Sequence, residues 1–222
     1  MASTYTGPAS LRVNVDLIAR ITDEYSAAEY MIMQCVDNGL EGHIDRALEA
    51  DSSFQKWLEA MPDETPAALE AYQHEYRPDD FNAVDVAIRE HAAALSSGQL
   101  LFHGGCIPFA PDGTFITTRP FSTTFCPQVA LRSAEWAGKA YNADQVNIYL
   151  LRVVSPNTKV FVFDPRGSEK GHEKEVLFAS GTTLVLRSRR ALRDDYKVSR
   201  SIAHFRTEEK TVAAYLCEVD VY

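Results

Sequence analysis

The sequence has few features that would assign it to a specialised class of protein. Its four cysteines are scattered, with no Cys-x-x-Cys pair and no Cys/His cluster at metal-ligand spacing; they are Cys35, Cys106, Cys126 and Cys217. A disulfide framework or a zinc site would need such spacing. We therefore expect reduced cysteines, a cytoplasmic protein and no bound metal.

Long apolar runs are also absent, as is an excess of positive charge. No stretch approaches the length of a membrane span, and residues 1–10 have neither the positive start nor the apolar core of a signal peptide. The net charge of −9 argues against a protein whose main task is to grip a nucleic-acid backbone, because that task needs a basic surface. The remaining composition, 45% hydrophobic and 24% charged, is typical of a soluble globular protein without a membrane partner.

The chain divides into a helical part and a strand-rich part. Turn signals cut residues 11–97 into four or five short helices, the last running from about Asp80 to Leu95. We predict an α+β fold in which a helical region, residues 1–97, packs on a core, residues 98–222, as one compact unit. Within the core, short apolar segments separated by Gly, Pro and Asp predict strands at residues 99–103, 115–125, 146–154, 159–163, 176–178, 183–186 and 212–221, and a helix from about Pro127 to Tyr141.

Two carboxylates precede one of these strands. In an extended chain, residues two apart project from the same face, so Glu173 and Glu175 would share a face and Lys174 would point the other way. Such a pair can stabilise a developing cation and can orient or deprotonate an attacking group. The alternative is that they are exposed charges at the edge of a strand, as Glu-Lys-Glu runs often are.

Three short segments occur in a fixed order: LLFHGG at 100–105, PFSTTF at 120–125 and EKEVLFASGT at 173–182. In this order they resemble the mono-ADP-ribosyltransferase family. In that family the first strand carries Arg or His followed by Gly, the second an aromatic-Ser-Thr-Ser pattern, and the third is preceded by Glu-x-Glu. The resemblance covers residues 98–222 and implies a core of two packed, mainly antiparallel sheets.

The resemblance also implies an activity. The family transfers ADP-ribose from NAD by expelling nicotinamide through an oxocarbenium-like state, the kind of cation that carboxylates stabilise in glycosidases. Glu175 matches the catalytic Glu, which accepts a hydrogen bond from the ribose 2′-hydroxyl, and Ser122 matches the Ser that positions it. Glu173 matches the Glu that directs the acceptor in arginine-modifying members, so protein arginine is the favoured acceptor.

Other motif residues are implied to bind NAD. Gly104 matches a Gly whose backbone binds the carboxamide, and His103 can bond a ribose hydroxyl. Phe125 either stacks on nicotinamide or packs in the core. The rest of the implied NAD-binding set from these strands is Phe102, Thr123 and Thr124.

His103 departs from the Arg that usually accompanies the Ser-Thr-Ser pattern. A His cannot supply the fixed bidentate charge that Arg brings to a diphosphate. Arg119 and Arg132 are candidates for that role, although a surface Arg is more often a solvated charge.

Other interpretations remain open. The same site could modify RNA or DNA bases or hydrolyse NAD without an acceptor, and the chain could be a non-catalytic module that kept the fold. Small members of the family resemble bacterial or phage toxins of toxin–antitoxin or phage-defence systems, which would bring an antitoxin or chaperone partner. A basic cluster could bind RNA, although neighbouring Asp194 and Asp195 favour a solvated turn; it consists of Arg187, Arg189, Arg190 and Arg193.

Overall fold

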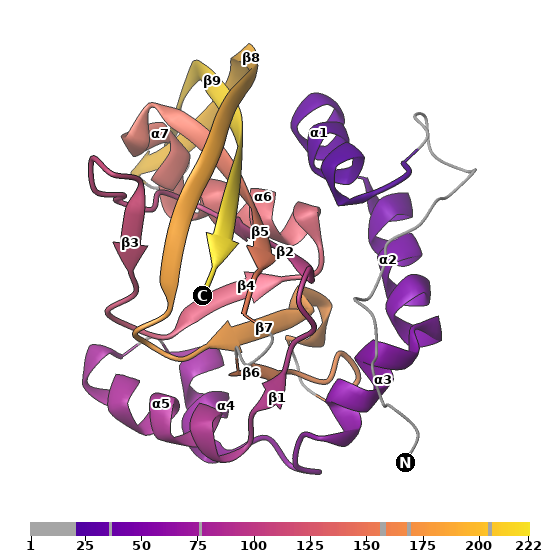
Figure 1. Ribbon diagram of the computed structural model, residues 1–222. Helices are drawn as coiled ribbons and strands as arrows, with labels where there is room; N and C mark the ends of the chain where they lie inside the picture. The colour runs from indigo at the N-terminus through magenta and orange to yellow at the C-terminus, as the bar shows by residue number, and fades with distance from the viewer. Residues whose placement is uncertain (1–20, 36, 76, 156–158, 168–169, 204–205) are drawn as a thin grey trace.

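A computed structural model of the chain describes residues 21–35, 37–75, 77–155, 159–167, 170–203 and 206–222. Within these ranges, five α-helices precede the main strands and two more interrupt them (Figure 1). The helices are α1 (Glu24–Gln34), α2 (Asn38–Ala50), α3 (Ser52–Glu59), α4 (Ala67–His74), α5 (Phe81–Glu90), α6 (Pro127–Glu135) and α7 (Lys139–Ala143). Three 3-10 turns are η1 (Pro78–Asp80), η2 (Trp136–Gly138) and η3 (Gly171–Glu173).

The strands form one sheet in the order β1-β6-β7-β4-β2-β5-β9-β8-β3. They are β1 (Ala93–Ala94), β2 (Leu100–Gly104), β3 (Thr114–Ile116), β4 (Phe121–Thr124), β5 (Gln145–Val153), β6 (Lys159–Val162), β7 (Glu175–Phe178), β8 (Thr183–Ala203) and β9 (Arg206–Val221). All neighbours are antiparallel except β5 and β9, which are parallel. The α+β class and the four or five short helices before residue 98 are confirmed within the described residues; the part of the helical prediction before residue 21 lies outside them.

The expected pair of sheets is wrong in one respect, because the ladder is continuous. Its two halves, β1-β6-β7-β4 and β2-β5-β9-β8-β3, meet through the single register pair Phe102↔Thr124. Because this junction is so short, the two halves of the sheet can lie at an angle to each other, as two separate sheets would. The ladder of hydrogen bonds nevertheless remains continuous. Figure 1 shows β4 and β7 running across the direction of β8 and β9. The junction lies where LLFHGG meets PFSTTF.

Several predicted boundaries move for identifiable reasons. The last N-terminal helix ends at Glu90 rather than Leu95, because Ala93 and Ala94 pair with the edge of β6. The strand predicted at residues 115–125 divides into β3 and β4 around Pro120, which has no amide hydrogen to give to a ladder.

The helix predicted from Pro127 to Tyr141 is broken. Ala137 and Gly138 have φ of 54° and 74°, a left-handed kink that separates α6 from α7. Trp136 lies at this kink and is 73% exposed.

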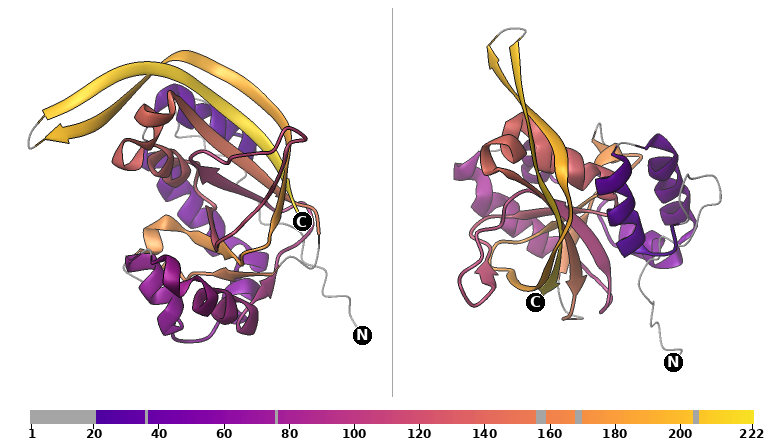
Figure 2. Two further views of the ribbon diagram at one scale, coloured as in Figure 1. Left: turned by 90° about the vertical axis from the view of Figure 1, so that its left-hand side faces the viewer. Right: turned by 90° about the horizontal axis from the view of Figure 1, so that it is seen from above.

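The last two strands are far longer than the sequence predicts. β8 and β9 form a curved two-stranded arm that extends well beyond the body of the protein (Figure 2). The four arginines placed by sequence in a turn lie on β8 instead. Each has a partner: Arg187 pairs with Asp220, Arg190 with Glu29 and Arg193 with Asp195, while Arg189 lies over the ring of Tyr215.

The helical region contributes to the same apolar core as the sheet. Phe54 and Trp57 of α3 pack on Phe125, with ring centroids 5.4 Å and 6.2 Å away, and the main cluster of buried residues draws members from both parts. At the other end of β7, buried Asp85 of α5 accepts hydrogen bonds from the amide and hydroxyl of Ser180. Helix α5 therefore contacts the segment that follows β7. None of the described helices has the length and apolar content needed to cross a membrane.

Candidate active site

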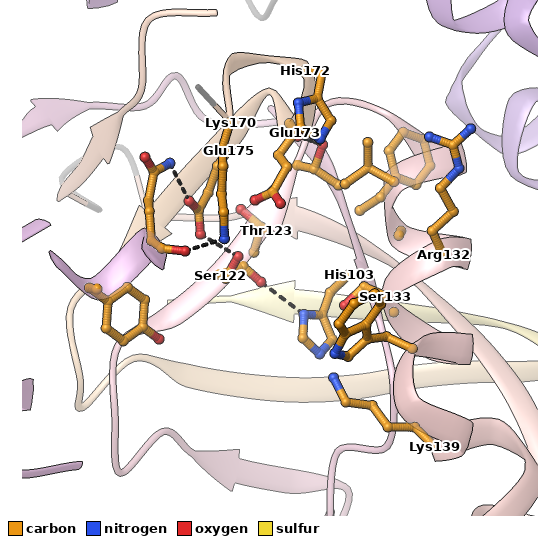
Figure 3. Close-up of a pocket in the computed structure, with 18 of the residues that line it drawn as sticks. His103, Ser122, Thr123, Arg132, Ser133, Lys139, Lys170, His172, Glu173 and Glu175 are labelled. Carbon is orange, nitrogen blue, oxygen red and sulfur yellow. Dashed lines mark hydrogen bonds between the residues drawn. The ribbon is translucent and has the colours of Figure 1, made fainter. Parts of the chain in front are cut away.

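A cavity of about 630 Å³ opens where α4, α6, β2, β4 and η3 meet (Figure 3). This volume lies in the range of about 300–1,000 Å³ that is usual for small-molecule sites. All three sequence motifs contribute to its wall. The motif residues that line it are Phe102, His103, Gly104, Ser122, Thr123, Thr124, Glu173 and Glu175.

Glu175 begins β7 and is buried, with 6% of its surface exposed. Its two carboxylate oxygens have different donors: Ser122 Oγ donates to Oε1 at 2.5 Å and Gln73 Nε2 donates to Oε2 at 2.9 Å. Burial raises the pKa of Glu175, while these two hydrogen bonds oppose the rise because they stabilise the ionised form. The site thus holds a desolvated carboxylate in a fixed orientation.

The register of β4 on β7 explains the contact with Ser122. Thr124 lies opposite Glu175 and Ser122 lies opposite Leu177, so Ser122 is the diagonal neighbour of Glu175 on the same face. The two threonines bind backbone instead. Thr123 Oγ1 donates to the carbonyl of Val176 at 2.7 Å and Thr124 Oγ1 to that of Glu173 at 2.6 Å. The Ser-Thr-Thr strand therefore fixes the backbone on both sides of Glu175.

Glu173 and Glu175 line the same cavity, although the chain between them is not extended. Glu173 ends the 3-10 turn η3, and Lys174 adopts a left-handed conformation with φ of 48° before β7 begins. The carboxylate of Glu173 is close enough to act on Glu175, whose pKa it raises. The expected shared face is thus reached by a turn rather than by strand alternation.

Lys174 points away from the cavity, as the sequence predicts, but it is buried. Its side chain is 1% exposed, and Nζ lies 2.9 Å from Asp45 and 3.7 Å from Glu41. These acids are four residues apart in α2, so they share one face of that helix. The middle residue of Glu-Lys-Glu therefore anchors the motif to the helical region.

Replacing Lys174 with Met is expected to lower the free energy of unfolding by about 2 kcal/mol. Breaking a buried ion pair typically costs about 3–5 kcal/mol, and the partial exposure of Asp45 and Glu41 reduces the penalty here. Denaturant unfolding measures the change. Lys159→Met, at the exposed first residue of β6, is the matched control and should have little effect. Equal stabilities of the two variants would contradict the anchoring role.

His103 is held as a neutral ring with a defined tautomer. Its Nδ1 lies 2.8 Å from the carbonyl oxygen of Ser122, which can only accept, so Nδ1 carries the proton. Burial is the main cause, and with the smaller contributions of the Lys139 and Arg119 charges it lowers the pKa of His103 to about 4. Nε2 is then left as a hydrogen-bond acceptor. The ring also packs 4.6 Å from that of Phe121.

This lowered pKa predicts a loss of stability in mild acid. An unfolded His binds a proton near pH 6.5, whereas folded His103 stays neutral down to about pH 4, so acid favours the unfolded chain. Between pH 7 and pH 5 the resulting loss of folding stability amounts to about 2 kcal/mol. Denaturant unfolding of wild type and of His103→Gln at both pH values measures it. The wild type should lose about that much more stability than the variant; parallel losses would show that His103 is protonated when folded.

Gly104 lines the cavity, but the absence of a side chain at this position is what allows α6 to pack closely on β2. A Cβ at this position would lie 1.6 Å from the carbonyl oxygen of Ala130. The glycine is therefore required because α6 crosses β2 at this point, a reason different from the ligand approach that the sequence suggested.

Two implied cofactor residues lie elsewhere. Phe125 is 2% exposed and packs between Phe54 and Trp57, so the structure places it in the core. Arg119 is exposed in the turn before β4 and is not part of the cavity wall, although its charge acts on His103. Arg132, the other candidate for the diphosphate, does line the cavity and lies 3.9 Å from Glu41.

Several residues of the cavity wall lie outside the three sequence motifs. Tyr72 and Gln73 come from α4, where helical spacing indicates core packing and gives no signal for a site. Lys139 follows the kink at Trp136, and both side chains line the cavity. Lys170 lies in the polar segment before Glu173 and donates to the carbonyl of Gln73. The position of Lys170 beside the Glu pair is the one signal that could have identified it.

No protein-family model matches the sequence, and no curated protein matches it. Among solved structures the chain is similar to Plx2a, an ADP-ribosyltransferase toxin from Paenibacillus larvae, with 10% identity over 82% of this chain and 96% of Plx2a and a TM-score of 0.47. It is also similar to the ADP-ribosyltransferase Vis, a toxin from Vibrio splendidus, in complex with agmatine, with 13% identity over 87% of this chain and 90% of Vis and a TM-score of 0.46.

A third similar structure is C2-I, the enzymatic component of the C2 toxin from Clostridium botulinum, with 11% identity over 74% of this chain and a TM-score of 0.44. The chain spans 45% of the length of C2-I.

Proposed function

We propose that the protein is an NAD-dependent ADP-ribosyltransferase that acts on a macromolecular acceptor. The observation that carries the proposal is the convergence of the three motifs on one cavity, with Ser122 donating to buried Glu175 at 2.5 Å and Glu173 in the same wall. These are the residues to which the family resemblance gives chemical roles. A non-catalytic module would have no chemical reason to hold them in this arrangement.

In the proposed reaction the bond between the ribose C1′ and the nicotinamide nitrogen breaks, and its electron pair leaves with nicotinamide. The ionised Glu175 accepts a hydrogen bond from the ribose 2′-hydroxyl and stabilises the positive charge that develops on the sugar. Ser122 holds that carboxylate in place. A nitrogen of the acceptor then attacks C1′ and gives its proton to Glu173.

Binding of NAD would use both a neutral hydrogen-bond acceptor and cationic side chains of the cavity. Neutral His103 offers Nε2 to a ribose hydroxyl, whereas Arg132 and Lys139 are cations that line the wall near α6 and α7 (Figure 3). We assign the diphosphate to Arg132 and Lys139 in place of Arg119, because both line the cavity and Arg119 does not. Exposed Trp136 at the same rim is suited to stack on a ring of the dinucleotide.

The favoured acceptor is protein arginine. Glu173 supplies the carboxylate that a guanidinium would meet. A nucleic-acid acceptor would need a basic surface, but the chain carries a net charge of −9 and the arginines of β8 are engaged within the molecule. We further propose that the protein acts as a bacterial or phage effector toxin. This role is supported by the family resemblance.

The test uses NAD labelled in the adenylate moiety with protein and RNA fractions as acceptors. The labelled product should resist nuclease and be degraded by protease, and mass spectrometry should place the label on arginine. Label sensitive to nuclease would instead indicate nucleobase modification. Release of nicotinamide without labelled product would indicate hydrolysis, and a wild-type protein that leaves NAD intact would overturn the proposal.

A further inference from the structure

Gln73 of α4 reaches the proposed catalytic carboxylate from the helical region. Its side chain is nearly buried, and Nε2 lies 2.9 Å from Oε2 of Glu175. An ionised carboxylate only accepts hydrogen bonds, so the amide presents its nitrogen to Glu175. Ser122 already occupies Oε1, which means that both oxygens have a protein donor.

We infer that Gln73 is a positioning residue for Glu175 and that the helical region thereby completes the active site. The inference rests on the proposed function. A carboxylate oxygen has two lone-pair directions, so Oε2 can accept from Gln73 and from a ribose hydroxyl together. With donors on both oxygens the carboxylate plane cannot rotate, and its free lone pair stays aimed at the cavity.

Several contacts fix α4 where Gln73 needs it. The Tyr72 hydroxyl donates to the carbonyl of Pro120 at 3.2 Å, directly before the Ser-Thr-Thr strand. Leu69, one turn earlier, is fully buried in a small core with Phe161, Phe163 and Leu177. Lys170 donates to the carbonyl of Gln73 itself. The position of Gln73 is therefore fixed by contacts with the residue before β4, with the core on the sheet and with the segment before Glu173.

The hydrogen bond from Gln73 lowers the pKa of Glu175 against the larger rise caused by burial. Of the charged groups that act on this carboxylate, Glu173 raises its pKa and Lys170 lowers it. The other titratable or charged side chains around the cavity are Tyr72, His74, His103, Arg132, Lys139 and His172. Glu175 works in its ionised form, so a higher pKa moves the acid limb of NAD cleavage to higher pH.

The test replaces Gln73 with Met, which is similar in length but donates no hydrogen bond. We expect the acid limb of the pH profile for NAD cleavage to move up by about one pH unit. A carbon-13 NMR titration of the Glu175 carboxyl, which needs no turnover, should show the same shift. Leu69→Ala is the matched control: it weakens the packing of α4 but leaves the donor, so it should lower stability and leave the limb in place.

An unchanged pKa of Glu175 in Gln73→Met would overturn the inference, as would an equal shift in Leu69→Ala. If Gln73→Met fails to fold, Gln73→Glu retains the length and shape, and its added negative charge should raise the pKa of Glu175 further; no rise would be equally decisive. A wild type that does not cleave NAD overturns the proposed function, while the NMR titration still decides the role of Gln73.

Discussion

Replacing Glu175 with Gln is expected to reduce the rate of NAD cleavage by roughly 10² to 10³. The amide keeps the shape of the carboxylate but lacks the negative charge that would stabilise the developing oxocarbenium ion. Release of nicotinamide from labelled NAD, followed for wild type and variant at the same protein concentration, measures the effect. Equal rates would show that the cavity performs no such chemistry.

The stability of this variant provides its own control. The folded pKa of Glu175 lies above that of an unfolded Glu, so the ionised group opposes folding at neutral pH, and the opposition disappears below about pH 4.5. Gln can still accept from Ser122, and the amide of Gln73 can turn to accept from it. At pH 7 the variant should therefore be at least as stable as wild type, which separates lost catalysis from lost folding.

Replacing Glu173 with Gln should uncouple transfer from cleavage. A positioned general base contributes roughly 10² to 10⁴ in rate, so labelling of protein arginine should fall by at least about a hundredfold. Nicotinamide release to water should change by only a few fold, because Glu175 and its donor Ser122 remain in place. Measuring both products in one reaction provides the ratio.

The backbone around Glu173 should survive the substitution. The carbonyl of Glu173, not its side chain, accepts from Thr124, so η3 and the start of β7 keep their hydrogen bond. Parallel losses of labelling and nicotinamide release would contradict the division of labour and would assign Glu173 to the same step as Glu175. Glu175→Gln, which should lose both products together, is the matched comparison.

The motif residues of the candidate site could be predicted from sequence. Their spacing along the chain brings them to the same cavity even where the backbone conformation differs from the one expected. Glu173 and Glu175 were expected to share a face through strand alternation, whereas the chain reaches that arrangement through a left-handed Lys174. Residues such as Gln73 and Lys139 could not be found, because their chemistry depends on where a helix end comes to lie. Phe125 had two interpretations in sequence, and packing against α3 decides for the core.

The fold was predictable in its class and in the approximate place of most elements. The length of β8 and β9 could not be predicted from the sequence, because charged residues such as Arg190 and Asp195 give a polar pattern that resembles a turn. On a two-stranded arm both faces can be polar, and ion pairs replace the apolar alternation on which strand prediction depends. The sheet-joining pair Phe102↔Thr124 is likewise a tertiary contact with no local signal.

The place of β9 in the sheet determines when the site can assemble during synthesis. β9 lies between β5 and β8, inside the ladder and third from its β3 edge, yet it is the last strand in the described part of the chain. Until it leaves the ribosome, β5 lacks one neighbour and β2, which carries His103, rests on an unfinished ladder. Parallel, non-local pairing of this kind also forms slowly. A nascent chain that already contains all three motifs but not β9 would thus lack the supported cavity and, under the proposed function, would not cleave NAD.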